Sequence, residues 1–393
     1  MAGGPAAILS PEERGPIGGT GVKVVNVVAA RPNFMKVAPI AAEMRRHPTI
    51  QQRLVHTGQH YSAGLSADFL AALGLPEPDV NLGVGSGSHA VQTAEVIKRF
   101  EPVLEEERPD LVVVVGDVNS TLAAALTAVK MDVPVAHVEA GLRSFDRTMP
   151  EEINRLLTDQ ISRYLFTTEP SAERNLRAEG IAAERIHFVG NTMIDTLLAH
   201  LGTLDVEAAL ARYAVRRHGY ALLTIHRPSN VDTPEALGEV LEALAALDQA
   251  VRKTDLGESF QMILPIHPRT EKNLEAFNLL QRAQAVPGLV LLPPMGYGDF
   301  VALMSAAGVV LTDSGGIQEE TTVLGVPCLT LRTNTERPIT LEQGTNVLVG
   351  RDRDKIVQHG LAALTGARPT PRRPDLWDGR AAQRIVEILL RTL

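Results

Sequence analysis

Cysteine, aromatic residues and long apolar runs are all scarce in this chain of 393 residues, and each scarcity excludes a class of protein. Cys328 is the one cysteine, so no disulfide can form within the chain, which fits a reducing, cytoplasmic setting. Apolar runs such as 111–115 are far shorter than the ~20 residues that a membrane-spanning helix needs. Phe, Trp and Tyr make up 4% of the residues, so Ala, Val, Leu and Ile must build the core.

The charge balance is acidic, with 38 Lys and Arg against 46 Asp and Glu, a formal net charge of −8. This balance argues against nucleic acid or an anionic membrane surface as a partner. The first 20 residues lack the basic region and apolar stretch of a secretory signal, and we expect a disordered, Gly/Pro-rich lead-in there. Because the net charge is negative, an anionic ligand must be held locally, by a few basic groups and backbone N–H groups.

From residue 22 onward, short apolar runs rich in β-branched residues alternate with longer amphipathic segments. This alternation predicts a parallel sheet with helices on both faces, which is a doubly wound α/β fold. Strands are expected at 22–30, 52–57, 110–116, 133–138, 163–167 and 185–189, and helices at 35–47, 64–73, 89–107, 120–131, 151–162 and 170–179.

The same pattern starts again after a helical stretch at 191–213 and a polar break at 216–219. Because a chain of this length forms two or three domains, we expect α/β domains at 21–203 and 204–374, then a final segment at 375–393. The second set of strands is expected at 220–226, 260–266, 288–292, 307–312 and 327–331, and its helices at 234–252, 270–280, 298–306, 316–324, 353–364 and 381–392.

Polar residues directly follow many of these strands. In open α/β sheets ligands bind beyond the carboxyl ends of the strands, so two facing sheets would place these residues around one cleft. They are Arg31, residues 58–60, Gly116, Asp117, Glu139, His226, His267 and residues 313–316.

The stretch TDSGGIQEE at 312–320 is the clearest phosphate-binding signal. Paired glycines let the backbone approach a ligand, and the start of a helix offers free N–H groups and a positive dipole end. The same letters also fit an ordinary strand-to-helix turn with Asp313 or Ser314 as N-cap. Glu319 and Glu320 suit the helix dipole, or one of them could accept hydrogen bonds from ribose hydroxyls.

Basic residues follow other strands. Arg31, Lys36 and the segment 332–337 have the side chains that grip phosphate oxygens, although each is also compatible with a solvated surface. His226 follows the strand ALLTI and could protonate or hydrogen-bond a phosphate leaving group, or could simply be a satisfied histidine at a strand end.

Three carboxylates stand at similar places: Asp117, Glu139 and Glu151. Carboxylates are costly beside apolar strand ends unless they are paired, although Asp117 could cap a helix and Glu151 could favour a helix dipole. Clustered together, they could raise the pKa of one member and make it a proton acceptor near neutral pH. His56 and His60 flank the exit of a strand, and no HExxH or cysteine cluster supports them, so no metal is expected.

Four segments resemble the non-hydrolysing UDP-N-acetylglucosamine 2-epimerases: VGDVNSTLA at 115–123, HVEAGLRSFDRTMPEEINR at 137–155, LTDSGGIQEE at 311–320 and TERP at 335–338. The resemblance runs from about residue 22 to the final helix. It implies two Rossmann-like domains in the glycosyltransferase-B arrangement, with the nucleotide in the cleft between them. It also implies a homodimer, and a last helix that crosses back onto the first domain.

By motif, the resemblance implies Asp117, Glu139 and Glu151 as catalytic carboxylates and His226 as the catalytic histidine. For the diphosphate it implies Arg31, Lys36, Arg337, Ser314, Gly315 and Gly316. It implies Glu320 for the ribose and Phe300 stacked on uracil, with the main chain at Met295 beside the base. Arg143, Asp117, Glu139 and His226 complete the implied substrate contacts.

The implied reaction is reversible C2 epimerisation of UDP-GlcNAc and UDP-ManNAc. The C2 proton lies beside an amide nitrogen and is not acidic, so its removal must be coupled to the loss of UDP from C1. Anti elimination gives a 2-acetamidoglucal, and reprotonation with re-addition of UDP gives the other isomer. This route needs no NAD or metal, so no cofactor is expected. A hydrolysing epimerase that releases ManNAc, a glycosyltransferase and a non-catalytic nucleotide-sugar sensor remain alternatives.

The chain also departs from the family's common letters. Asn33 stands where RPE is frequent, and Pro228 follows His226-Arg227 where RES or AEN is frequent. Tyr61 and Ser62 replace residues that the family ties to activation by substrate, so we do not expect that form of regulation.

Overall fold

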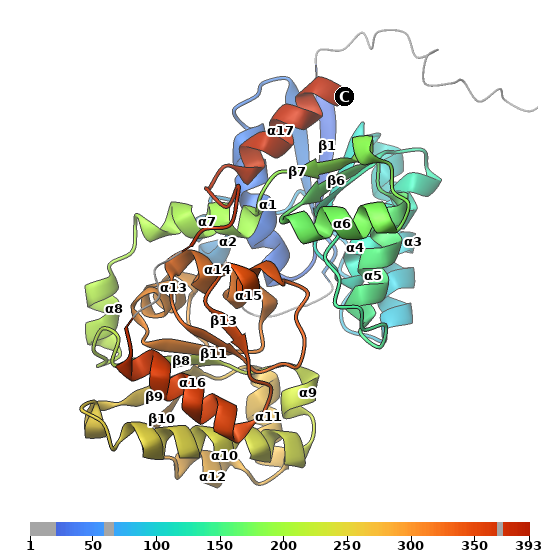
Figure 1. Cartoon of the computed structure of the whole chain (residues 1–393). Helices are drawn as coiled ribbons and strands as arrows, with labels where there is room; N and C mark the ends of the chain where they lie inside the picture. The colour runs from blue at the N-terminus through green and yellow to red at the C-terminus, as the bar shows by residue number, and fades with distance from the viewer. Residues whose placement is uncertain (1–20, 59–66, 368–371) are drawn as a thin grey trace, which may run out of the picture.

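The computed structural model describes residues 21–58, 67–367 and 372–393, which form two parallel sheets wrapped by helices (Figure 1). The expected lead-in at 1–20 lies outside the described residues. The first sheet has the strand order β3-β2-β1-β4-β5-β6-β7. Its strands are β1 (Val22–Val28), β2 (Ile50–His56), β3 (Val80–Asn81), β4 (Leu111–Val115), β5 (Val135–Ala140), β6 (Tyr164–Thr167) and β7 (Ile186–Phe188). Its helices are α1 (Arg31–Met44), α2 (Ala67–Ala72), α3 (His89–Glu107), α4 (Asn119–Lys130), α5 (Pro150–Ile161) and α6 (Pro170–Ala178).

The second sheet has the order β10-β9-β8-β11-β12-β13. Its strands are β8 (Tyr220–Thr224), β9 (Gln261–Pro265), β10 (Leu289–Leu292), β11 (Val309–Thr312), β12 (Cys328–Thr330) and β13 (Asn346–Leu348). The remaining helices are α7 (Thr192–Leu201), α8 (Val206–Arg212), α9 (Pro228–Val231), α10 (Pro234–Val251), α11 (Pro268–Ala276), α12 (Leu280–Gln284), α13 (Tyr297–Ala306), α14 (Gly315–Leu324), α15 (Ile339–Glu342), α16 (Arg353–Thr365) and α17 (Ala381–Thr392). The predicted doubly wound α/β fold is confirmed.

The central strands are buried on both faces, as their uninterrupted apolar sequences require. In β4, Val113 and Val115 belong to one hydrophobic cluster, and Val112 and Val114 belong to another. This alternation is the two-residue period of a strand whose opposite faces each meet a layer of helices. Helices on both sides leave the ends of the strands, and not the faces, free to carry a site.

The last segment returns to the first sheet. Ile385 and Leu389 of α17 are buried in the same cluster as α1, and Figure 1 shows this terminal helix beside the first strands. Trp377, 1% exposed, donates from Nε1 to the carbonyl of Thr168 at 2.8 Å. Trp377 is also buried in a cluster with Val301 and Leu303 of α13, so the C-terminal segment contacts both halves of the molecule.

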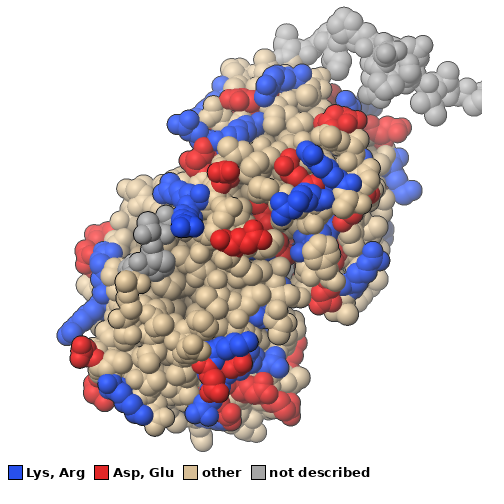
Figure 2. Space-filling model, in the orientation of Figure 1, with Lys and Arg blue, Asp and Glu red and all other residues tan. Residues whose placement is uncertain are grey.

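Within the described residues, no helix has the length and apolar character needed to cross a membrane. Acidic and basic side chains are interspersed over the face that Figure 2 shows.

Candidate active site

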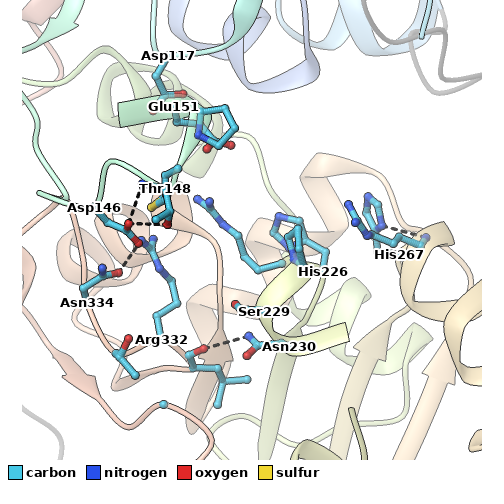
Figure 3. A pocket seen from close by; sticks show the side chains of 18 of the residues that line it. Asp117, Asp146, Thr148, Glu151, His226, Ser229, Asn230, His267, Arg332 and Asn334 are labelled. Carbon is cyan, nitrogen blue, oxygen red and sulfur yellow. Dashed lines mark hydrogen bonds between the residues drawn. The ribbon is translucent and has the colours of Figure 1, made fainter. Parts of the chain in front are cut away.

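A cleft of about 1630 Å³ is lined by residues that follow strands of both sheets. Asp117 and Glu151 enter it from the first half of the chain, and His226 and Arg332 enter it from the second (Figure 3). This is the arrangement expected when the carboxyl ends of two parallel sheets face each other.

Glu139 lies at the junction of the two halves. Its Oε2 contacts Lys36 Nζ of α1, and its Oε1 lies 2.6 Å from Arg337 Nη2, which comes from the second half. Glu139 has a φ of +73°, and the pairing of β5 with β6 is irregular at this point. A non-glycine residue in the left-handed region is strained, and such strain is typically retained where it aims a functional side chain.

Arg337 is the centre of a buried ion network. Besides contacting Glu139, its guanidinium lies 2.6 Å from Glu336 Oε1 and 2.8 Å from Glu319 Oε1. The contact with Glu319 is an ion pair without hydrogen-bond geometry. Burial raises the pKa of Glu319 to about 6, although Arg337 opposes the shift. A Cβ on Gly315 would lie 2.5 Å from Arg337 Nη1, so glycine is required there for the guanidinium to reach the network.

Asp117 and Glu152 share Arg155. Nη1 of Arg155 lies 2.5 Å from Asp117 Oδ2, and its Nη2 lies 2.7 Å from Glu152 Oε2. Burial would raise the pKa of Asp117, but Arg155, Lys36 and the neighbouring cations outweigh it and hold the pKa below its usual value. Asp117 is therefore ionised at neutral pH, and the upward shift considered from sequence does not apply to this carboxylate.

The two neighbouring glutamates of α5 have different surroundings. Glu152 is 2% exposed and accepts hydrogen bonds from the backbone N–H groups of Ser144 and Phe145, so it fixes the loop that follows β5. Glu151 is half-buried and lines the cleft. Of this pair, Glu151 is the carboxylate placed to meet a ligand.

His226 projects into the cleft with 38% of its side chain exposed. Its Nδ1 lies 2.8 Å from Asp313 Oδ1, and Asp313 also accepts from the backbone N–H groups of His226 and Arg227. Asp313 thus does not cap α14. Ser314 occupies the N-cap position, without a capping hydrogen bond from its side chain.

The N-terminus of α14 lies beside a second group of expected ligand residues. Gly315 and Gly316 form its first turn, which leaves backbone N–H groups free to bind an anion. Glu320, further along the helix, accepts a hydrogen bond from the Tyr297 hydroxyl at 2.9 Å. Burial raises the pKa of Glu320 to about 7, despite that hydrogen bond. Phe300, in the first turn of α13, is half-buried.

The remaining expected residues lie on adjoining elements. Arg31, at the start of α1, has its guanidinium 4.8 Å from the centre of the Phe69 ring. Met295 is half-buried in the loop between β10 and α13. Asn33 accepts from the backbone N–H of Ala30 and donates to the carbonyl of Val115, a donation that a glutamate could not make. Tyr61 and Ser62 lie outside the described residues.

Arg143 is not brought to this site. It is 3% exposed and pairs with Glu179 and Asp159, and Asp159 in turn contacts the buried His137 at 2.6 Å. Burial would lower the pKa of Arg143, but Glu179 and Asp159 outweigh burial and raise it. The other nitrogen of His137 contacts the carbonyl of Gly116 at 2.8 Å, so the network holds the loop that carries Asp117. The position of Arg143 does not support the substrate contact that the resemblance implies for it.

Several residues that build the site were given no role from sequence: Glu152, Arg155, Asp159, Tyr297 and Asp313 as the partner of His226. Arg155 closes the same nineteen-residue motif as Glu139, and this local signal places it near the carboxylates. Over the described residues, no group of three or more His, Cys, Asp and Glu side chains could hold a metal ion.

Comparison with known proteins gives consistent matches. The model of the UDP-N-acetylglucosamine 2-epimerase family matches residues 42–390. The UDP-N-acetylglucosamine 2-epimerase of Methanocaldococcus jannaschii is 41% identical over 371 residues, which cover 94% of this chain and 99% of the relative. A UDP-2,3-diacetamido-2,3-dideoxy-D-glucuronate 2-epimerase of Pseudomonas aeruginosa is 38% identical over 370 residues, with the same coverage.

Solved structures agree with these matches. The crystal structure of the M. jannaschii UDP-GlcNAc 2-epimerase in complex with UDP-GlcNAc and UDP is 41% identical, with a TM-score of 0.85 over 94% of this chain and 100% of that one. The Neisseria meningitidis UDP-GlcNAc 2-epimerase bound to UDP-GlcNAc is 31% identical, with a TM-score of 0.81 and the same coverage.

Proposed function

The chain belongs to the UDP-N-acetylglucosamine 2-epimerase family, and we propose that it interconverts UDP-GlcNAc and UDP-ManNAc without releasing free sugar. The observation that carries the proposal is the position of Glu139, which is held between Lys36 of one half and Arg337 of the other. A carboxylate at this junction, with Asp117 and Glu151 in the adjoining cleft, supplies groups for moving a proton at C2 beside cations for a departing diphosphate.

The proposed reaction begins with loss of the C2 proton to a carboxylate as the C1–O bond to UDP breaks. The electron pair of the C2–H bond forms the C1–C2 double bond of a 2-acetamidoglucal, and UDP takes the pair of the C1–O bond. A proton delivered to the opposite face of C2, followed by re-addition of UDP, completes the inversion. Asp117 is ionised at neutral pH and can serve as the proton acceptor, although the cations that keep it ionised also lower its basicity. The exchange needs no redox cofactor, since no net oxidation occurs.

We assign the binding of UDP to both halves. Arg31 and Lys36 approach from α1, Arg337 from the second half, and Ser314, Gly315 and Gly316 from the start of α14. Glu320 would take the ribose hydroxyls and Phe300 the uracil, with the main chain at Met295 beside the base. His226 would meet the diphosphate from across the cleft. Closure of the two halves would keep the intermediate from escaping.

The sugar is either GlcNAc or a modified relative. The P. aeruginosa match acts on a diacetamido uronate, as its name states, at an identity close to that of the GlcNAc enzymes. The test is a panel of nucleotide sugars, including UDP-GlcNAc and the diacetamido uronate, with products read by NMR and mass spectrometry. Formation of UDP-ManNAc without free UDP supports the proposal. Free ManNAc with stoichiometric UDP would show a hydrolysing enzyme, and turnover only with an added acceptor would show a glycosyltransferase.

We further propose a homodimer that works in the cytoplasm in polysaccharide biosynthesis. Phe145 is 79% exposed, and Ile153 and Leu157, one turn apart on α5, are 38% and 49% exposed. Residues at i and i+4 share one face of a helix, so these two form an apolar stripe that a second copy could cover.

A further inference from the structure

Asp313 and His226 meet at the carboxyl ends of β11 and β8. Asp313 is 0% exposed, and its Oδ1 lies 2.8 Å from Nδ1 of the imidazole. The contact departs from the ideal hydrogen-bond direction, a feature common in unliganded sites, where such contacts tighten when substrate binds. Because Asp313 is fully buried and His226 is 38% exposed and lines the cleft, we infer that the edge of the ring away from Asp313 is the one that can meet a ligand.

The orientation of the Asp313 carboxyl group is fixed by its other oxygen. Oδ2 accepts from the backbone N–H of His226 at 2.9 Å, from that of Arg227 at 2.8 Å and from Nδ2 of Asn230 at 3.1 Å. All three partners are donors only. Burial would raise the pKa of Asp313, but His226 and the two backbone N–H groups hold it below its usual value, so the carboxyl group is ionised, with Oδ1 facing Nδ1 of the imidazole.

An acceptor facing Nδ1 selects the tautomer of the ring, because the hydrogen bond at one imidazole nitrogen sets the protonation of the other. Neutral His226 therefore carries its proton on Nδ1 and leaves Nε2 unprotonated. The neighbouring His267, whose ring centre is 5.5 Å away, shows the opposite arrangement. Its Nδ1 accepts from the backbone N–H of Arg269 at 3.2 Å, so its proton lies on Nε2.

We propose that Asp313 is the positioning residue of His226, holding the imidazole with Nδ1 protonated and Nε2 turned to the diphosphate of the substrate. This inference rests on the proposed function, in which His226 touches the leaving UDP. As the C1–O bond breaks, its electron pair passes to the β-phosphate oxygen, and imidazolium Nε2–H delivers a proton to that oxygen. Neutral imidazole remains, still bound to Asp313 through Nδ1–H, and the proton returns to Nε2 when UDP adds again.

The decisive variant is Asp313→Asn. The three fixed donors require an oxygen where Oδ2 lies, so the asparagine NH₂ group must face Nδ1 of His226. That nitrogen then has to accept, and the proton of the neutral ring moves to Nε2. The swapped ring can still donate a hydrogen bond to phosphate but loses the carboxylate that supports its protonated form. We expect kcat to fall on the order of 10²-fold while KM changes by less than about threefold.

The tautomer is read directly from long-range ¹H–¹⁵N correlations of histidine-labelled protein at pH 8.5, with His226 assigned by the variant His226→Gln. We expect Nδ1–H in the wild-type protein and Nε2–H in Asp313→Asn, with His267 unchanged as an internal reference. The matched control is Asp248→Asn, an equally buried carboxylate on α10 that pairs with Arg252 and does not line the cleft. It should leave both kcat and the His226 signals unchanged.

A wild-type His226 protonated on Nε2 alone would overturn the inference, even if the Asp313 variant failed to fold. So would a kcat within threefold of wild type in a folded Asp313→Asn protein, or an equal loss in the control. If the wild-type protein proved inactive on every nucleotide sugar, the proposed function would fall. The tautomer measurement would then still decide separately whether Asp313 orients His226.

Discussion

Replacing Glu320 by glutamine should stabilise the folded protein while weakening its hold on the nucleotide. Glu320 is 3% exposed, and burial, together with Glu319, raises its pKa from 4.5 to about 7. An acid with a raised pKa binds more protons in the folded state than in the unfolded one between about pH 4.5 and pH 7. Its contribution to stability therefore falls as the pH rises through this window. Glutamine keeps an oxygen for the Tyr297 hydroxyl and removes the buried charge.

The size of the effect follows from the shift. Each pKa unit corresponds to about 1.4 kcal/mol, so a shift from 4.5 to about 7 makes the ionised side chain cost about 3 kcal/mol at pH 8. At pH 5.5 the folded protein holds Glu320 protonated, and the cost falls to about 1 kcal/mol. The variant should thus exceed the wild-type free energy of unfolding clearly at pH 8 and only slightly at pH 5.5.

The assay is urea unfolding at both pH values, followed by calorimetric titration with UDP. The loss of a charged acceptor for the ribose should weaken UDP binding on the order of tenfold to a hundredfold. Glu275→Gln, an exposed glutamate of α11, is the control and should change neither quantity. A Glu320→Gln protein that is less stable than wild type at pH 8, or whose stability advantage does not shrink on acidification, would show that the buried charge of Glu320 does not destabilise the fold.

Three further changes probe other parts of the molecule. In Gly315→Ala the new Cβ lies 2.5 Å from Arg337 Nη1 and must displace it, so kcat/KM in steady-state assays should fall at least about tenfold, and full activity would contradict the network. Trp377→Phe leaves the carbonyl of Thr168 without its donor and should lower the free energy of unfolding in urea by about 1–3 kcal/mol. An unchanged free energy of unfolding would show that this hydrogen bond does not anchor the C-terminal segment. Leu157→Glu puts a charge on the apolar stripe of α5. If the proposed dimer forms through this stripe, the variant should be a monomer in light scattering, and a variant that remains dimeric would place the interface elsewhere.

The architecture was predictable because its signals are local. Near-continuous apolar strands such as β4 indicate burial on both faces, and each long helix carries its own apolar period. The strands missed are β3 with two residues and β13 with three, which are too brief to show a period. The equally short β7 and β12 were predicted as parts of longer apolar runs. The single-turn helices α9 and α15 were missed for the same reason, since a four-residue stretch cannot display helical spacing.

The site was predictable only as far as the residues at strand ends. His226 lies just beyond β8 and Glu139 lies near the end of β5, so both could be singled out from sequence, but their partners depend on contacts made by folding. Asp313 lies 87 residues from His226, and the same letters read equally well as a helix cap. Arg143 was expected at the substrate because the resemblance of the motif at 137–155 implied it. Its partner Glu179 lies 36 residues away, and no spacing in the sequence indicates that the two pair.

We propose that carboxylates at the junction of the two halves exchange the C2 proton of a UDP-sugar. The most direct test is incubation with UDP-GlcNAc in deuterated water, with deuterium at C2 read by NMR in both isomers. We expect exchange at C2 of UDP-GlcNAc and UDP-ManNAc, slowed strongly by Asp117→Asn, Glu139→Gln and Glu151→Gln. Wild-type protein that interconverts the isomers without taking up deuterium, or folded variants that exchange at the wild-type rate, would exclude these carboxylates as the groups that move the C2 proton.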